Sequence, residues 1–216
     1  MTRSLRNRFM GVAVAVVLAL VPSVASALAL IDFGTGDAGF GGTITLTAGG
    51  NFLGTAIPLE SLATSGTSPS GTFDLSGPIA AGNDASDTNG AAQFDFDTTA
   101  KTFTVFGGVP SLGIISNQTL LTGTISSFSY SILGNILQLA VNGTDAKSVD
   151  LLTALGIPTD AKFAFASFEL AAVATGAANT YTATSVDILN QQVAEPFTMV
   201  LLGTGLLGLA ALRRKI

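Results

Sequence analysis

The chain of 216 residues contains no cysteine, no histidine and no tryptophan. Without cysteine it forms no disulfide, and without cysteine or histidine it lacks the usual ligands of zinc, iron–sulfur and haem centres. The absence of histidine also removes the commonest general base near neutral pH and excludes a Ser-His-Asp triad. We therefore expect no metal centre and no cofactor, and we interpret the protein as a non-enzyme.

Basic residues are also scarce between the two ends of the chain. Residues 28–192 hold three lysines against 13 acidic residues, which gives this body a net charge of −10, whereas the whole chain carries −5. The three lysines are Lys101, Lys147 and Lys162. Because so acidic a surface repels phosphate backbones, the composition argues against nucleic acid as a partner.

The first 27 residues have the layout of a secretory signal peptide. Three arginines come first, namely Arg3, Arg6 and Arg8. An uncharged run at 9–21 and then Pro22 follow, and the small residues Ala25 and Ala27 provide an Ala-x-Ala site for signal peptidase. We predict cleavage after Ala27, with Ala29 as the alternative position and an uncleaved N-terminal anchor as the alternative fate.

The last 24 residues, 193–216, carry a second export-type pattern. Ala194, Glu195 and Pro196 precede an apolar run at 197–212, and a basic cluster ends the chain: Arg213, Arg214 and Lys215. As a helix, the 16 apolar residues extend about 24 Å at roughly 1.5 Å per residue, and the terminal cations oppose passage through the bilayer. The pattern predicts a single transmembrane helix at 197–212.

This tail resembles the PEP-CTERM sorting signal, in which a Pro-Glu-Pro motif, a short Gly- and Leu-rich helix and an arginine cluster follow one another. Here Ala194 stands in the first position of the motif, while Glu195 and Pro196 match it. The resemblance implies a Gram-negative bacterium, an exosortase-type processing enzyme as partner, and passage through the inner membrane. It also implies association with extracellular polysaccharide and biofilm. A permanent C-terminal membrane anchor is the alternative interpretation of the same tail.

Alternating apolar residues predict that the body at 28–192 is one all-β domain. A hairpin that turns at Gly134-Asn135 pairs Ile132 with Leu137 and Tyr130 with Leu139. A second hairpin pairs phenylalanines and a valine across a four-residue loop at 98–101: Phe94 with Val105, and Phe96 with Phe103. Many short strands with almost no helix predict an antiparallel β-sandwich or a jelly-roll-like domain.

Two irregular features are predicted within this body. The apolar phase of residues 162–173 changes from odd to even positions, which predicts a β-bulge near Ala166-Ser167. A short helix is predicted at 149–155, ended by Gly156 and Pro158. The polar loops at 64–71 and 77–90 are predicted to be surface excursions.

Candidate ligand sites in the body are weak. Asp95 and Asp97 lie on one side of a predicted strand, about 7 Å apart, which is within the range of inverting glycosidases but on one strand and not across a cleft. The oxygen-rich segment at 83–90 lacks two ligands of an EF-hand loop, so an irregular calcium site is the alternative to a solvated turn. Four phenylalanines are interpreted as core residues in preference to a sugar-stacking platform: Phe33, Phe40, Phe52 and Phe73.

Together these patterns predict an exported, non-catalytic surface or extracellular-matrix protein, sorted by its tail. The alternatives are an extracellular glycan hydrolase or calcium-dependent carbohydrate-binding protein, and a permanently anchored membrane protein.

Overall fold

The computed structural model describes residues 28–35, 41–79 and 90–193. The signal-peptidase residues Ala25 and Ala27, most of the candidate calcium segment at 83–90, and Phe40 lie outside the described residues. So does the predicted sorting signal with its helix at 197–212. Its named residues are Ala194, Glu195, Pro196, Arg213, Arg214 and Lys215.

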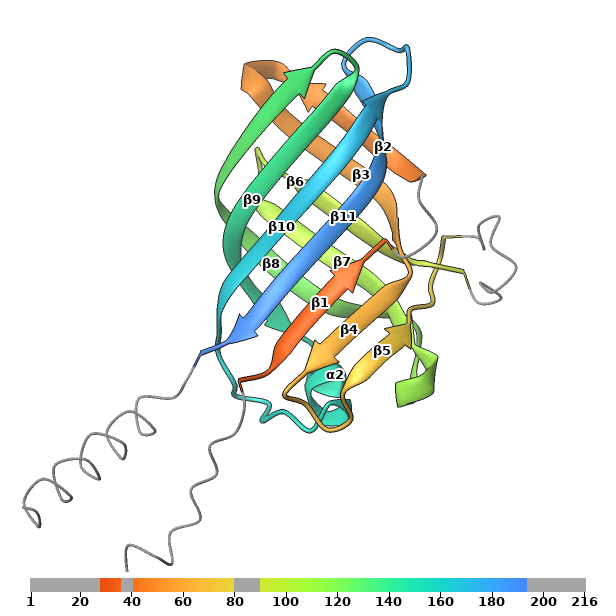
Figure 1. The fold of residues 1–216 in the computed structure, drawn as a ribbon, viewed down its shortest axis with the longest axis vertical. Coiled ribbons are helices and arrows are strands. Elements are labelled where there is room, and N and C mark those ends of the chain that lie inside the picture. Colours follow the sequence, from red (N-terminus) through yellow and green to blue (C-terminus); the bar gives the residue numbers. More distant parts are fainter. Residues whose placement is uncertain (1–27, 36–40, 80–89, 194–216) are drawn as a thin grey trace, which may run out of the picture.

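The described residues form an antiparallel β-structure (Figure 1). Its elements are β1 (Leu30–Gly34), β2 (Gly41–Thr47), η1 (Ala48–Gly50), β3 (Asn51–Leu59), β4 (Ser61–Ser65), β5 (Gly71–Asp74), β6 (Ala92–Asp97), β7 (Thr102–Val109), η2 (Pro110–Leu112), β8 (Ile114–Leu133), β9 (Ile136–Lys147), α2 (Val149–Ala154), β10 (Phe163–Ala174) and β11 (Thr180–Gln192). The antiparallel all-β class predicted from the alternating pattern is confirmed.

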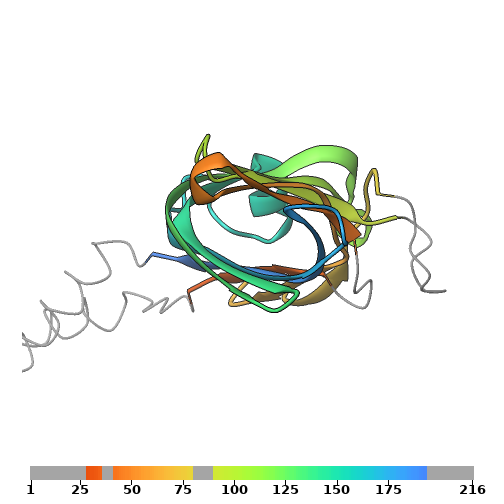
Figure 2. The same cartoon turned by 90° about the horizontal axis from the view of Figure 1, so that it is seen from above.

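Eight of these strands close into a barrel. The order β10-β9-β8-β7-β6-β3-β2-β11 is completed by direct pairing of β10 with β11, and the view from above shows the resulting flattened ring (Figure 2). The prediction of a sandwich or jelly roll is therefore wrong at this finer level. Alternation identifies the inward-facing residues in both architectures, but only the β10–β11 pairing joins the two edges of the sheet.

Strand β11 pairs with β10 along one edge and with two strands in succession along the other. Its first residues pair with β2, with Tyr181 opposite Ile44, and its last residues pair with β1, with Gln191 opposite Leu30. Strands β4 and β5 continue outward from β1. A three-stranded flap, β1-β4-β5, thus extends the sheet beside the barrel, and β1 brings residue 30 next to the end of β11 (Figure 1).

Aromatic rings fill the middle of the barrel. The ring of Phe168 on β10 lies 5.0 Å from Phe94, 5.2 Å from Phe96 and 5.7 Å from Phe103, measured between centroids. Phe168 therefore crosses the interior from β10 to β6 and β7. A barrel of eight strands is just wide enough for such side chains to fill it. A Cβ on Gly123 would overlap the Phe103 ring, so glycine is required beneath that ring.

Both predicted hairpins are confirmed in register. Strands β8 and β9 pair Tyr130 with Leu139 and Ile132 with Leu137, and β6 and β7 pair Phe94 with Val105. Phe33 and Phe52 are fully buried, as the core interpretation predicted, and Phe73 packs against the core while partly buried.

The predicted bulge in β10 is displaced. The β10–β11 register shifts between Phe163 and Phe165, while Ala166 and Ser167 pair regularly with β9. The phase change itself is present, because Phe163 and Phe168 are both buried. The extra residue thus comes two positions earlier than predicted, in the part of β10 that precedes its first pairing with β9.

Helix α2 lies at the same end of the barrel as the first residue of β1 and the last residue of β11 (Figure 1). Ser148 caps it by accepting a hydrogen bond from the Leu151 backbone N–H at 3.2 Å. Leu151 and Leu152 are buried, and Gly156 follows with φ of +65°. The predicted short helix is confirmed, and we call this end of the molecule the terminus end.

Candidate functional site

The two carboxylates singled out from the sequence lie on the outer face of β6. Asp95 and Asp97 line a shallow depression of about 360 Å³, together with polar side chains of the neighbouring strands. They are Thr55 of β3 and Thr102 and Thr104 of β7, and Gln93 of β6 itself also lines the depression. The depression is the strongest candidate for a ligand surface on the predicted site residues.

Hydrogen bonds occupy both carboxylates. Asp95 Oδ1 accepts from the backbone N–H of Ala56 at 2.7 Å, and its Oδ2 accepts from Gln93 Nε2 at 2.6 Å. Ala56 has φ of +51° and lies where the register of β3 with β6 shifts. Asp95 therefore holds an irregular stretch of β3 in place, which is a structural role.

Asp97 shapes the turn between β6 and β7. Its Oδ1 accepts from the backbone N–H groups of Thr99 at 2.7 Å and Ala100 at 3.0 Å, the arrangement of an Asx turn. Both carboxylates belong to one strand and lie on the same side of the depression. The geometry offers hydrogen-bonding groups for a neutral, hydroxyl-rich ligand and no acid–base pair across a cleft.

A second polar group is buried inside the barrel. Lys147 Nζ lies 2.6 Å from Asp145 Oδ1, with both side chains fully shielded, and 3.7 Å above the Phe163 ring. Burial lowers the pKa of Lys147 to about 8, against the opposing attraction of Asp145. Burial likewise raises the pKa of Asp145, and Lys147 opposes that shift. This ion pair faces the same interior as Leu139 and Val141, because all four occupy odd positions of β9.

A third group joins the flap to the barrel. Asp32 on β1 shares a side-chain hydrogen bond with Asp187 on β11, and Glu169 on β10 lies directly opposite Asp187 in the sheet. Desolvation by burial, the hydrogen bond to Asp187 and its negative charge raise the pKa of Asp32 from 3.8 to about 7. Asp32 therefore retains its proton at pH values where an isolated aspartate is ionised.

Neither buried group was found from the sequence, although the pattern contained a signal for one of them. The alternation that places Leu137, Leu139 and Val141 inward continues to Asp145 and Lys147. Extending the phase to the end of the strand would have predicted a buried ion pair. Asp32 gives no comparable signal, because it lies on the outward side between Ile31 and Phe33 and its burial comes from neighbouring strands.

Among residues 28–35, 41–79 and 90–193, no three His, Cys, Asp or Glu side chains are arranged to hold a metal ion. In the same part of the chain, no helix has the length and apolar character needed to span a bilayer. The chain matches no protein-family model, no curated protein and no solved structure.

Proposed function

We propose that the chain is an exported, non-catalytic surface or extracellular-matrix protein, delivered by its terminal signals and retained near extracellular polysaccharide. The observation that carries this proposal is the position of the predicted processing points relative to the barrel. The first described strand begins at Leu30 and the last ends at Gln192. Cleavage after Ala27 and near Glu195 would leave every described strand intact.

The contacts of Ala29 favour one of the two predicted N-terminal cleavage positions. Ala29 is buried, its N–H donates to Gln192 Oε1 at 3.2 Å, and its carbonyl accepts from the Gln192 N–H at 2.8 Å. Cleavage after Ala29 would remove a residue that holds the end of β11. Cleavage after Ala27 preserves these contacts, so we propose Leu28 as the first residue of the exported form.

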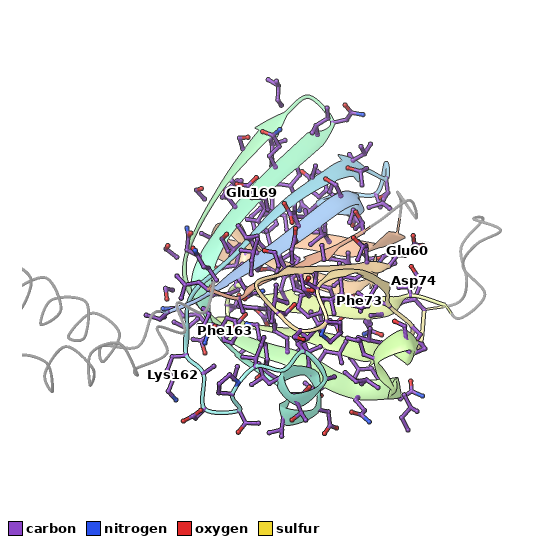
Figure 3. All side chains as sticks on the ribbon, turned by 60° about the horizontal axis from the view of Figure 1, so that its bottom comes forward. Glu60, Phe73, Asp74, Lys162, Phe163 and Glu169 are labelled. Atoms are coloured by element: carbon purple, nitrogen blue, oxygen red, sulfur yellow. The ribbon has the colours of Figure 1, made fainter. Side chains whose placement is uncertain are left out.

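The tail begins close to the barrel. The Val193 N–H donates to the Lys162 carbonyl at 2.8 Å, and only residues 194–196 separate Val193 from the apolar run. Four Cα–Cα steps reach at most about 14 Å. While the tail is in the membrane, the terminus end of the barrel would therefore face that membrane, and the opposite end would point away. Figure 3 shows Lys162 and Phe163 on one side of the molecule, and Glu60 and Asp74, at the ends of flap strands, on the other.

Intact-mass measurement of the protein from membrane and medium fractions tests the proposal. We expect an N-terminus at Leu28 and, in the released form, a C-terminus near Glu195 with residues 197–216 missing. A variant lacking its last 20 residues should fail to reach the same destination. Full-length tails in every fraction would support the permanent anchor instead, and correct delivery of the truncated variant would refute sorting by the tail.

The polar depression on β6 keeps a glycan-directed function as the second candidate. Its threonine hydroxyls, and the lone pairs of Asp95 and Asp97 beyond those already used within the protein, offer hydrogen bonds to sugar hydroxyls. Glycan turnover by the wild type that disappears in the Asp95→Asn/Asp97→Asn double variant would favour a hydrolase. Loss of glycan binding without any turnover in the wild type would favour a carbohydrate-binding surface. A Thr99→Ala variant in the adjacent turn provides the control, because its side chain lies outside the depression.

A further inference from the structure

The tip of the β8–β9 hairpin exposes a cluster of large apolar side chains. Leu133 is 82% exposed, Ile136 44% and Ile132 42%, and Tyr130 follows at 45%. The hairpin turns at Gly134 and Asn135, at the end of the barrel opposite α2 and the terminus end (Figure 1). We call Ile132, Leu133 and Ile136 the apolar tip.

The apolar tip presents aliphatic groups on both faces of the hairpin. Ile132 pairs with Leu137 on one face, and the next pair, Leu133 with Ile136, lies on the other, because successive residues of a strand point to opposite sides. A groove on a protein covers one face of such a hairpin and leaves the other in water. Hydrocarbon surrounds both faces, so this distribution favours a lipid environment over a one-sided docking site.

The charge distribution favours the same environment. Residues 102–144 contain no Asp, Glu, Lys or Arg, although the body as a whole is strongly acidic. Transfer of a charged group out of water is costly, and this stretch, which includes most of β8 and β9, requires no such transfer. An acidic surface would be repelled from anionic lipid, whereas this end of the hairpin meets a zwitterionic surface without that penalty.

Along the hairpin, the side chains change from aliphatic at the tip to aromatic and polar one or two residues further from it. Tyr130 follows the aliphatic residues, and its ring packs edge-on against Phe52 with 4.8 Å between centroids. Ser131 and Gln138 form a hydrogen-bonded pair on the opposite face at 3.5 Å. Aromatic rings with one polar end are favoured at the level of lipid headgroups, with aliphatic side chains deeper. Two residues of strand extend about 7 Å, a depth typical of insertion at the bilayer interface.

We propose that the apolar tip inserts into the surface of a lipid bilayer, with Tyr130 at headgroup level. The inserting element is preformed, since its strands belong to the barrel and Tyr130 is held by Phe52. The tip lies at the end opposite the tail, so a molecule anchored by its tail would present the tip to a second membrane. Insertion itself does not depend on how the tail is processed, and it is separable from the proposed sorting function.

The test uses the full chain reconstituted in phosphatidylcholine vesicles, to which protein-free phosphatidylcholine vesicles are added. Because the chain has no cysteine, Leu133→Cys provides a unique position for an environment-sensitive fluorophore. Ala178→Cys is the matched control, since it is exposed in the β10–β11 turn at the same end. We expect the label at residue 133 to shift to the blue and brighten on addition of vesicles, and the label at residue 178 to stay unchanged.

Capture of the added vesicles provides the second readout. The Leu133→Ser/Ile136→Ser variant should capture them at least about tenfold more weakly, since burial of one aliphatic side chain corresponds to roughly a factor of ten in affinity. Circular dichroism checks that both variants retain their strands. Equal capture by wild type and variant, or equal fluorescence changes at both labels, would overturn the proposal. So would a change at residue 133 that depends on protein density and not on added lipid, because it would indicate a second copy of the chain.

Discussion

The Asp32–Asp187 pair makes the stability of the barrel depend on pH in a defined direction. The pKa of Asp32 is raised in the folded state from 3.8 to about 7, so folding favours the protonated carboxyl. The stabilisation is fully present below about pH 4 and is lost as the pH rises toward 7. The reason is that the unfolded chain releases this proton above about pH 4, whereas the folded protein keeps it up to about pH 7. Wild-type stability from this pair therefore falls between pH 4 and pH 7.

Replacement of Asp32 by Asn should remove that loss. A rise of the pKa from 3.8 to about 7 corresponds to roughly 4 kcal/mol, at about 1.36 kcal/mol for each tenfold change in proton affinity. Asp32 is only partly buried, so solvent screening reduces the expected effect to about 1–2 kcal/mol. We expect Asp32→Asn to raise the free energy of unfolding by that amount at pH 8, and to change it by less than about 0.5 kcal/mol at pH 4.

Urea unfolding of residues 28–193 between pH 4 and pH 8, followed by far-UV circular dichroism, measures the difference. Asp74→Asn, which removes an exposed carboxylate of β5, is the control and should leave the pH dependence unchanged. The ion pair at Asp145 and Lys147 is common to all variants and cancels in the comparison. An Asp32→Asn variant whose stability falls with pH as steeply as the wild type would refute the assigned proton.

Three further predictions concern the barrel interior, each checked by the same urea titration at pH 7. Phe168→Ala should cost about 3–5 kcal/mol, because it empties the centre of the aromatic cluster, while Phe168→Leu should cost clearly less; equal losses would contradict the central role of that ring. Gly123→Ala should cost about 1–3 kcal/mol by overlap with Phe103. Gly134→Ala, at a turn residue with φ of +64° and no atom close to the added Cβ, measures the separate cost of the backbone conformation. Lys147→Met alone should cost about 3 kcal/mol, because it leaves Asp145 buried and unpaired. The double variant Asp145→Leu/Lys147→Met should recover most of that stability. A double variant no more stable than the single one would contradict the unpaired-charge explanation.

The strand registers were predictable because they depend on local information. The type of turn at Gly134-Asn135 fixes which residues face each other, and a shift by one residue would have sent Leu137 and Leu139 to the solvent side. The loop at 98–101 fixes the second hairpin in the same way. In both cases the large apolar residues agree on only one register, so the sequence contains enough information to choose it.

Closure of the barrel was not predictable by the same reasoning. Pairing of β2 with β11 connects strands that no single turn relates, and the alternation along each strand is the same in a sandwich and a barrel. The position of the β10 bulge also depends on closure. Phe163 must face inward so that its ring lies against Lys147, while the register with β9 stays regular from Ala166 onward. The local sequence pattern shows neither of these constraints.

The candidate site was partly predictable. The sequence placed Asp95 and Asp97 on one side of a strand, and the structure brings them to a common depression. What the sequence lacked was their partners: the Ala56 N–H reaches Asp95 only because β3 is irregular at that point. The carboxylates are thereby tied to the backbone of the sheet, which explains why a pair with suitable spacing is not by itself a catalytic pair.

The pairing of β1 with the end of β11 limits where the proposed processing enzyme could cut without damage to the fold. Strand β1 holds the last residues of β11, and the Ala29 backbone is bonded to Gln192. A cut before Gln192 would free the edge on which the flap is built, whereas a cut at Glu195 lies beyond Val193, the last described residue, which is bonded to the Lys162 carbonyl. In the sequence, residues 194–196 separate Val193 from the apolar run. If the tail is cut there as proposed, the enzyme would act within three residues of Val193 on an already folded barrel, or before β11 has paired.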